Sequence, residues 1–180
     1  KSHPITKERS VSLELKEIKN EGIFYLPIDH QDCTQKSDQE AKIIKDYCSK
    51  ILGKNYTEEK QKKKMTIDDI LIVAPFNMQV NNIKKILNKK EARIGTIDKF
   101  QGQEAKVVFI SMTSSDPENL PRHKEFFFSR NRLNVAISRA QCVTVIIFNP
   151  KLLLADCQKI NELRLINNFC KLLDYKILNK

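Results

Sequence analysis

The chain has 180 residues, of which 41% are hydrophobic, and its 32 Lys and Arg outnumber its 22 Asp and Glu to give a net charge of +10. This length suits one domain with a sizeable core and the composition excludes disorder over the whole chain, while no apolar run approaches the ~20 residues that cross a bilayer. The charge favours a polyanionic partner such as nucleic acid, although a solvated lysine-rich surface would give the same count.

The five cysteines form no C-x-x-C pair, and their number is odd. This pattern argues against a disulfide framework or a zinc site, so we expect no bound metal and a reducing intracellular compartment, either bacterial cytoplasm or nucleus. The first residues lack both an initiator Met and a signal-peptide apolar region, and we therefore expect a segment cut from a longer protein.

The chain divides into a polar tether or linker at residues 1–20 and a domain at residues 21–180. A capping-box pattern at 37–40 predicts the start of a helix whose apolar face ends at Ile51. Residues 53–66 include Lys60-Gln61-Lys62-Lys63-Lys64 and have no apolar period, which indicates a flexible, lysine-rich surface loop; a loop that contacts phosphates is the alternative.

Five short apolar stretches alternate with helical patterns along the domain. Such strands, apolar throughout, predict a mainly parallel sheet of about five strands with helices on both faces, in an α/β doubly wound order. The expected strands are 23–28, 70–74, 93–97, 107–110 and 143–148, and expected helices follow Gln79, span Arg130–Ala140 and carry apolar residues from Leu163 to Leu173.

Ligands in open parallel sheets bind beyond the carboxyl ends of the strands, so the segments around those ends are the candidates for a site. The segment Gly95–Glu104 is dense in polar groups. Thr96 can hydrogen-bond a phosphate, Gly102 lets the main chain approach a ligand, and the acceptor-only Glu104 could hold sugar hydroxyls. An ordinary polar turn is the alternative.

Two arginines on the expected helix Arg130–Ala140 form the second candidate. Arg132 and Arg139 are seven positions apart and share one side of the helix. Guanidinium groups contact triphosphate oxygens bidentately, although two surface arginines on an amphipathic helix would show the same spacing. The third segment, Ala74–Gln79, lies between a strand and a helix and by itself indicates only a turn.

Together these segments resemble motifs IV, V and VI of superfamily-1 helicases, in the branch of the nonsense-mediated-decay RNA helicase. Residues 95–104 fit motif V, G-T-[VI]-D-x-F-Q-G-x-E, and residues 132–140 fit motif VI, R-L-N-V-A-[LI]-[ST]-R-A. Motif IV, as Pro75-Phe76-x-x-Gln79, is the weakest match, and the likeness is firm over about residues 70–150. It implies a RecA-like fold of the P-loop-NTPase type and the second motor domain of a DNA or RNA helicase.

The resemblance implies a role for each matching residue. Arg139 corresponds to the arginine finger that meets the γ-phosphate of ATP, and Glu104 to the carboxylate that contacts the ribose. Arg132, Gln79 and Gly102 are then expected on the ATP side. The positions expected on the nucleic-acid side are Thr96, Asp98, Gln101, Thr113 and Ser114. Some members carry an arginine directly after the motif IV glutamine, where this chain has Val80.

The sequence contains no G-x-x-x-x-G-K-[ST] and no Asp-Glu pair, so it lacks Walker A and Walker B elements. The resemblance implies that a first RecA-like domain of the same chain binds most of ATP and Mg²⁺, and that single-stranded DNA or RNA is the other partner. It leaves open a fused nuclease domain, and leans toward DNA and 5′→3′ movement by analogy alone. The alternatives are a catalytically silent, nucleic-acid-binding or regulatory RecA-like module and, more weakly, a free-standing nucleotide-binding domain.

Overall fold

The computed structural model describes residues 21–58, 60–115 and 129–154, together with six positions between 160 and 170. The expected tether at 1–20 and most of the expected last helix lie outside the described residues, and the polar stretch Thr113–Glu125, expected as a loop, is described only to Ser115.

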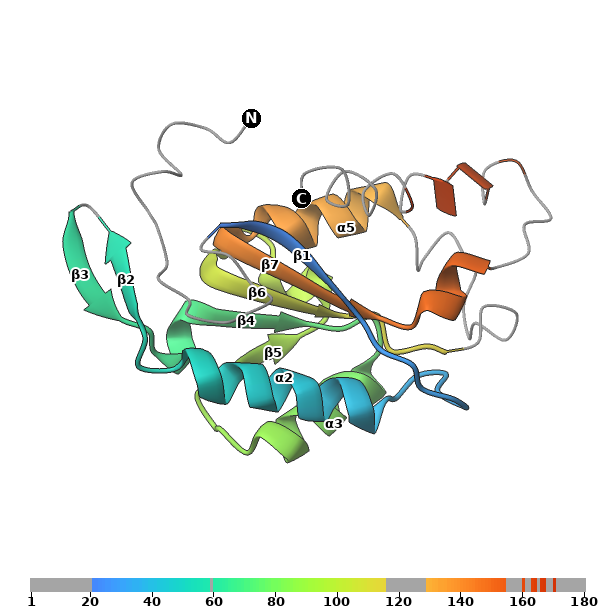
Figure 1. Cartoon of the computed structure of the whole chain (residues 1–180), viewed down its shortest axis with the longest axis horizontal. Coiled ribbons are helices and arrows are strands. Elements are labelled where there is room, and N and C mark those ends of the chain that lie inside the picture. Colours follow the sequence, from blue (N-terminus) through green and yellow to red (C-terminus); the bar gives the residue numbers. More distant parts are fainter. Residues whose placement is uncertain are drawn as a thin grey trace.

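The core of the fold is a five-stranded parallel sheet in the order β1-β7-β6-β4-β5. This arrangement confirms the predicted α/β fold with a parallel sheet (Figure 1). The strands are β1 (Gly22–Pro27), β4 (Ile70–Val73), β5 (Arg93–Gly95), β6 (Ala105–Ser111) and β7 (Ala140–Phe148).

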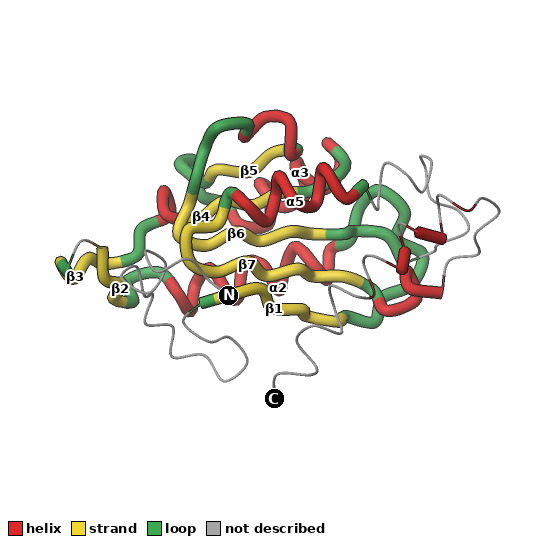
Figure 2. The backbone as a smooth tube through the Cα atoms, turned by 90° about the horizontal axis from the view of Figure 1, so that it is seen from above, coloured by secondary structure: helices red, strands yellow, loops and turns green. Residues whose placement is uncertain are grey.

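Helices cover both faces of the sheet, as the continuous apolar strands predict. Helices α2 (Asp38–Ile51) and α3 (Asn77–Leu87) lie on one face, and α5 (Arg130–Ser138) lies on the other (Figures 1 and 2). None of the helices among the described residues is long and apolar enough to cross a membrane.

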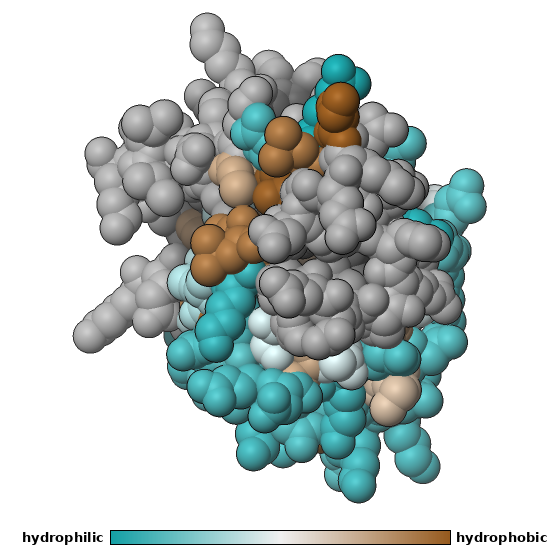
Figure 3. Space-filling view, turned by 90° about the vertical axis from the view of Figure 1, so that its right-hand side faces the viewer, coloured by the Kyte–Doolittle hydropathy of each residue, from teal (hydrophilic) through white to brown (hydrophobic). Residues whose placement is uncertain are grey.

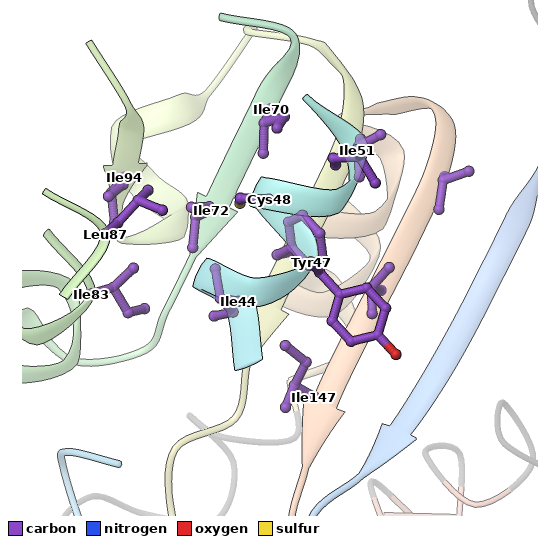
Figure 4. Packing of buried hydrophobic residues seen from close by; sticks show 14 of the residues in the cluster. Ile44, Tyr47, Cys48, Ile51, Ile70, Ile72, Ile83, Leu87, Ile94 and Ile147 are labelled. Atoms are coloured by element: carbon purple, nitrogen blue, oxygen red, sulfur yellow. The ribbon is translucent and has the colours of Figure 1, made fainter. Parts of the chain in front are cut away.

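Successive residues of each strand feed two separate cores because side chains alternate across a sheet. In β4, Ile70 and Ile72 pack toward α2 and α3, whereas Leu71 and Val73 pack toward α5. Figure 4 shows the first core, where Ile44, Tyr47 and other residues of α2 lie against the sheet.

The lysine-rich stretch is a β-hairpin, which corrects the expectation of an irregular loop at 53–66. Strands β2 (Asn55–Glu58) and β3 (Gln61–Lys64) pair antiparallel and project from the body (Figure 2). The four residues of β3 are all exposed, while Tyr56 of β2 is buried in the core under α2. Backbone hydrogen bonds between the two strands and one buried side chain, Tyr56, hold this exposed hairpin in place. Its sequence therefore shows no apolar period.

A buried carboxylate joins several elements near the carboxyl ends of the strands. Glu40 of α2 is fully buried, and its Oε1 lies 3.0 Å from the buried Nε2 of His30. Its Oε2 accepts hydrogen bonds from the Ser111 hydroxyl and, at 2.9 Å, from the Thr113 backbone N–H. We call Glu40 and these three partners the Glu40 cluster.

The start of α2 departs from a full capping box because of this cluster. Ser37 accepts a hydrogen bond from the Glu40 N–H at 3.3 Å, as the pattern predicts. The reciprocal bond is replaced, since the Glu40 carboxylate is occupied within the cluster and the Ser37 N–H donates instead to Gln79 Oε1 at 2.8 Å. Gln79 Nε2 also donates to Ser111 Oγ at 3.0 Å, so motif IV is tied to the cluster.

Replacing Glu40 with alanine is expected to lower the free energy of unfolding of this chain by ~3 kcal/mol or more, because three buried polar partners lose their shared acceptor. Urea denaturation followed by circular dichroism measures the change. The matched control is Gln39→Ala, at an exposed neighbouring position of the same helix, with an expected change within ~0.5 kcal/mol. A loss below ~1 kcal/mol in Glu40→Ala would show that the cluster contributes little.

Candidate functional site

The motif V segment crosses the molecule from one edge of the sheet to the other. Thr96 directly follows β5 and therefore lies at the carboxyl edge, the edge where the parallel strands end. The segment continues through the short 3-10 helix η2 (Ile97–Phe100), and Glu104 directly precedes β6 at the opposite, amino edge. We expected the polar groups of the site at the carboxyl ends of the strands. This expectation is wrong for Glu104, because a residue that precedes a parallel strand lies at the amino edge.

Local packing explains the two glycines of this segment. A Cβ atom on Gly95 would come within 2.8 Å of Lys99 Cδ and 2.9 Å of Phe100 Cε2, so no larger residue fits without displacing η2. Phe100 itself is buried in the core on the α5 side. Gly102 has a φ of +78°, in the left-handed region that favours glycine.

Arg139 and Glu104 lie next to each other at the amino edge. Arg139 caps the end of α5, and its backbone carbonyl accepts a hydrogen bond from the N–H of Ala105, the residue after Glu104, at 2.9 Å. The Arg139 guanidinium donates to the Val135 carbonyl at 3.1 Å and the Ser138 hydroxyl at 3.2 Å. Both acceptors are neutral, so these contacts leave its positive charge uncompensated.

Glu104 is exposed and is held from two sides. Its carboxylate Oε2 accepts a hydrogen bond from Gln141 Nε2 at 2.7 Å. Its carbonyl accepts one from Arg93 Nη1 at 3.0 Å, and Arg93 Nη2 donates to Gln103 Oε1 at 3.1 Å. The sequence did not point to Arg93 or Gln141, because they stand 11 positions before and 37 positions after Glu104 and belong to none of the motifs used to find the site.

An ion-pair network at the same edge connects the hairpin to the body. Lys106 of β6 contacts Glu58 of β2 and donates to Gln141 Oε1 at 2.5 Å, and Lys63 of β3 lies 2.9 Å from Glu58. Hydrogen bonds from Lys106 and then Lys63 lower the pKa of the Glu58 carboxyl to about 2. The lysine-rich stretch thus takes part in the structure of the amino edge.

The carboxyl edge contains a cavity of about 360 Å³. Its polar wall includes Thr96, Asp98 and Arg132, and Arg132 Nη1 lies 3.5 Å from Asp98 Oδ2. Figure 3 faces this side of the molecule, where hydrophilic residues cover much of the described surface. The apolar lining comes from Val73, Ile110, Met112, Leu133 and Ala136.

The two motif VI arginines consequently point to different places. Arg132 lies in the first turns of α5 and contacts Asp98 at the carboxyl edge, whereas Arg139 ends the helix at the amino edge. Seven residues correspond to ~10 Å along a helix axis, so one small ligand group does not bridge the two side chains. The structure therefore groups Arg132 with Thr96 and Asp98 rather than with Arg139.

Three other expected site residues are buried in this arrangement. Gln79, Thr113 and Ser114 have no exposed surface, and their side chains form hydrogen bonds inside the protein. A direct contact with ATP or nucleic acid would require them to become exposed. Gln101 and Gly102, in contrast, are exposed in the turn that leads to the amino edge.

Val80, where some relatives of the motif have an arginine, packs in the core on the α2 and α3 side and is 5% exposed. An arginine there would be desolvated, so this position does not face either edge. Among the described residues, no three His, Cys, Asp or Glu side chains gather in a way that could hold a metal ion.

Residues 10–151 match the AAA_12 family, described as an AAA domain. The chain belongs to this family. AAA_12 domains are the C-terminal RecA-like domains of superfamily-1 helicases that resemble the nonsense-mediated-decay helicase, which confirms the likeness seen in motifs V and VI.

Relatives of this AAA_12 domain include proteins named for both RNA and DNA. It is 31% identical over 126 residues, 67% of the chain, to the RNA helicase Mov10l1 of Mus musculus. It is 40% identical over 73 residues, 39% of the chain, to the DNA polymerase alpha-associated DNA helicase A of Schizosaccharomyces pombe. The matched parts span only 10% and 11% of those two proteins.

The ion pairs of Glu58 predict a pH-dependent contribution to the stability of the AAA_12 domain. Because folding lowers the pKa of Glu58 from 4.5 to about 2, the contribution is fully present above pH 4.5 and is lost as the pH falls toward 2. Glu58→Gln is therefore expected to cost roughly 1 kcal/mol at pH 7 and progressively less below pH 4.5. Urea unfolding at several pH values measures the difference, with the exposed Glu91→Gln as control. A difference that does not shrink in acid would contradict the assignment.

Proposed function

We propose that this chain is the second motor domain of an ATP-dependent nucleic-acid helicase or translocase, and that it supplies Arg139 as the arginine finger. The observation that carries the proposal is the separation of two sets of polar groups. Arg139 and Glu104 lie together at the amino edge, whereas Thr96, Asp98 and Arg132 surround a cavity at the carboxyl edge.

The amino edge has the chemistry that a nucleotide held by another domain needs. The charge of Arg139 is not compensated by its neutral acceptors, so it is available to stabilise the negative charge that develops on the γ-phosphate during hydrolysis. Glu104 is an exposed acceptor that suits the hydroxyls of the nucleotide sugar. The first motor domain would contribute the phosphate-binding loop and the Mg²⁺ ligands, because this sequence has neither Walker element.

The carboxyl edge has the chemistry of a nucleic-acid track. Thr96 can donate a hydrogen bond to a backbone phosphate, and Arg132 can add a charge-assisted one, with Asp98 holding its guanidinium. Arg132, expected on the ATP side, is therefore assigned to the nucleic-acid side. ATP binding would draw Arg139 toward the γ-phosphate and close the cleft, hydrolysis would release it, and alternating grip on the strand would become movement.

In the protein that contains both motor domains, Arg139→Ala is expected to lower nucleic-acid-stimulated ATP hydrolysis by ~10³-fold or more and to leave the affinity for a single strand largely unchanged. Steady-state ATPase assays and fluorescence anisotropy measure the two quantities. The 180-residue chain alone, as a control, is expected to hydrolyse no ATP. Near-normal turnover by Arg139→Ala would remove the finger assignment, and absent turnover by the unmodified protein would favour a silent binding module.

Arg132→Ala in the same protein is expected to weaken single-strand binding and to reduce the slope of log affinity against log salt concentration by about 1, since one phosphate contact is lost. The KM for ATP should stay nearly unchanged. Anisotropy titrations between low and physiological salt, with DNA and RNA oligonucleotides, check this. A raised KM with unchanged strand affinity would return Arg132 to the ATP side.

A further inference from the structure

Four side chains form a continuous series of contacts that ends at the carboxylate of Glu104. Glu58 of the hairpin contacts Lys106, Lys106 donates to Gln141 Oε1 at 2.5 Å, and Gln141 Nε2 donates to Glu104 Oε2 at 2.7 Å. We call this series the Glu58–Glu104 relay. It connects the lysine-rich hairpin to the residue proposed to contact the nucleotide sugar.

The chemistry of the two neighbours fixes the orientation of the Gln141 amide. The ammonium of Lys106 can only donate hydrogen bonds, and the ionised carboxylate of Glu104 can only accept them. Of the two ways to place the amide, only the one with its oxygen toward Lys106 and its nitrogen toward Glu104 satisfies both partners. Lys106 therefore controls the presentation of an N–H donor to Glu104.

A bulge in the sheet places Gln141 between these partners. Ala105 pairs with Ala140 and Val107 pairs with Val143, so Gln141 and Cys142 of β7 lie opposite Lys106 alone. A bulge of this kind redirects a side chain and is found beside functional sites. Here it brings the Gln141 side chain to the exposed amino edge, where Glu104 lies.

Lys106 is itself held from the hairpin side. Its side chain is only 9% exposed, and its Nζ lies 5.4 Å from the centre of the Tyr56 ring in addition to contacting Glu58. Tyr56 is buried and its hydroxyl donates to Asp69 at 3.3 Å, so both Lys106 contacts come from an anchored strand. The relay thus begins on a fixed part of β2 and ends on an exposed carboxylate that has no other side-chain restraint among the described contacts.

We propose that Lys106 and Gln141 are positioning residues that hold the Glu104 carboxylate toward the sugar hydroxyls of the bound nucleotide, so that the β2–β3 hairpin controls sugar recognition. The proposal rests on the function given above, because it takes Glu104 to contact the sugar. Gln141 occupies one carboxylate oxygen, which leaves the other to accept a hydrogen bond from a sugar hydroxyl. Loss of the relay lets Glu104 adopt several rotamers and weakens binding without removing a group that acts on the phosphates.

The test uses Gln141→Leu and Lys106→Met in the protein that contains both motor domains. Each variant is expected to raise the KM for ATP ~3- to 10-fold, the effect of losing one hydrogen bond to a charged group, with kcat nearly unchanged. The second readout is the preference for ATP over 2′-deoxy-ATP or 3′-deoxy-ATP, which should fall toward one. A purely structural role would not change this ratio selectively.

Two further variants sharpen the comparison. Gln103→Leu is the matched control, because Gln103 is the neighbouring exposed glutamine and contacts Arg93 instead of the Glu104 carboxylate. It should leave both KM and the sugar preference nearly unchanged. Gln141→Glu keeps an acceptor for Lys106 but places a like charge beside Glu104, so it should raise KM at least as much as Gln141→Leu while preserving the fold.

The outcomes separate the relay from the proposed function. If Glu104→Gln changes the sugar preference but Gln141→Leu, Gln141→Glu and Lys106→Met do not, the relay is overturned and the motor assignment stands. If Glu104→Gln leaves the sugar preference intact while Arg139→Ala abolishes turnover, the sugar contact fails and the relay proposal fails with it. Near-normal turnover in Arg139→Ala contradicts the finger assignment, and absent turnover in the unmodified protein contradicts the motor assignment.

Discussion

The buried carboxylate of Glu40 determines how the carboxyl edge of this domain is assembled. It accepts hydrogen bonds from the end of β6 and contacts a histidine in the connection after β1, while its own helix begins at Asp38 with Ser37 as the N-cap. A buried charge of this kind is costly unless every oxygen has a partner, and both oxygens have one here. The elements that supply those partners must therefore keep one relative position.

This constraint extends to the candidate site through Gln79. The motif IV glutamine joins the first residue before α2 to Ser111 of β6, so it acts inside the protein as a brace between α3 and the Glu40 cluster. Met112, which lines the cavity, directly follows Ser111 of this network. A rigid edge would suit the proposed grip on a nucleic-acid strand.

The amino edge is built on a different principle. It collects residues that directly precede strands or stand at their starts, and most of their contacts are exposed or half-exposed polar ones that involve Arg93, Lys106 and Gln141. Such contacts contribute little to stability, but they restrict the positions of a few functional groups. The domain thus has a carboxyl edge stabilised by burial and an amino edge where exposed polar contacts hold the side chains that the proposed function assigns to the nucleotide.

The sequence by itself determined the class of fold and the family, because continuous apolar strands require cover on both faces and two long motifs stand at fixed spacing. It also located Arg139, Glu104, Thr96 and Arg132 as the residues to consider. Tertiary structure decided which of these residues share an edge, since Arg132 and Arg139 lie on one helix yet end at opposite sides of the sheet. It alone revealed the hairpin and the Glu58–Glu104 relay, in which each contact joins residues 35 to 48 positions apart and no local pattern marks the members. Local spacing reports on helices and strands, whereas contacts between side chains from distant strands depend on strand order and on a bulge that no spacing encodes.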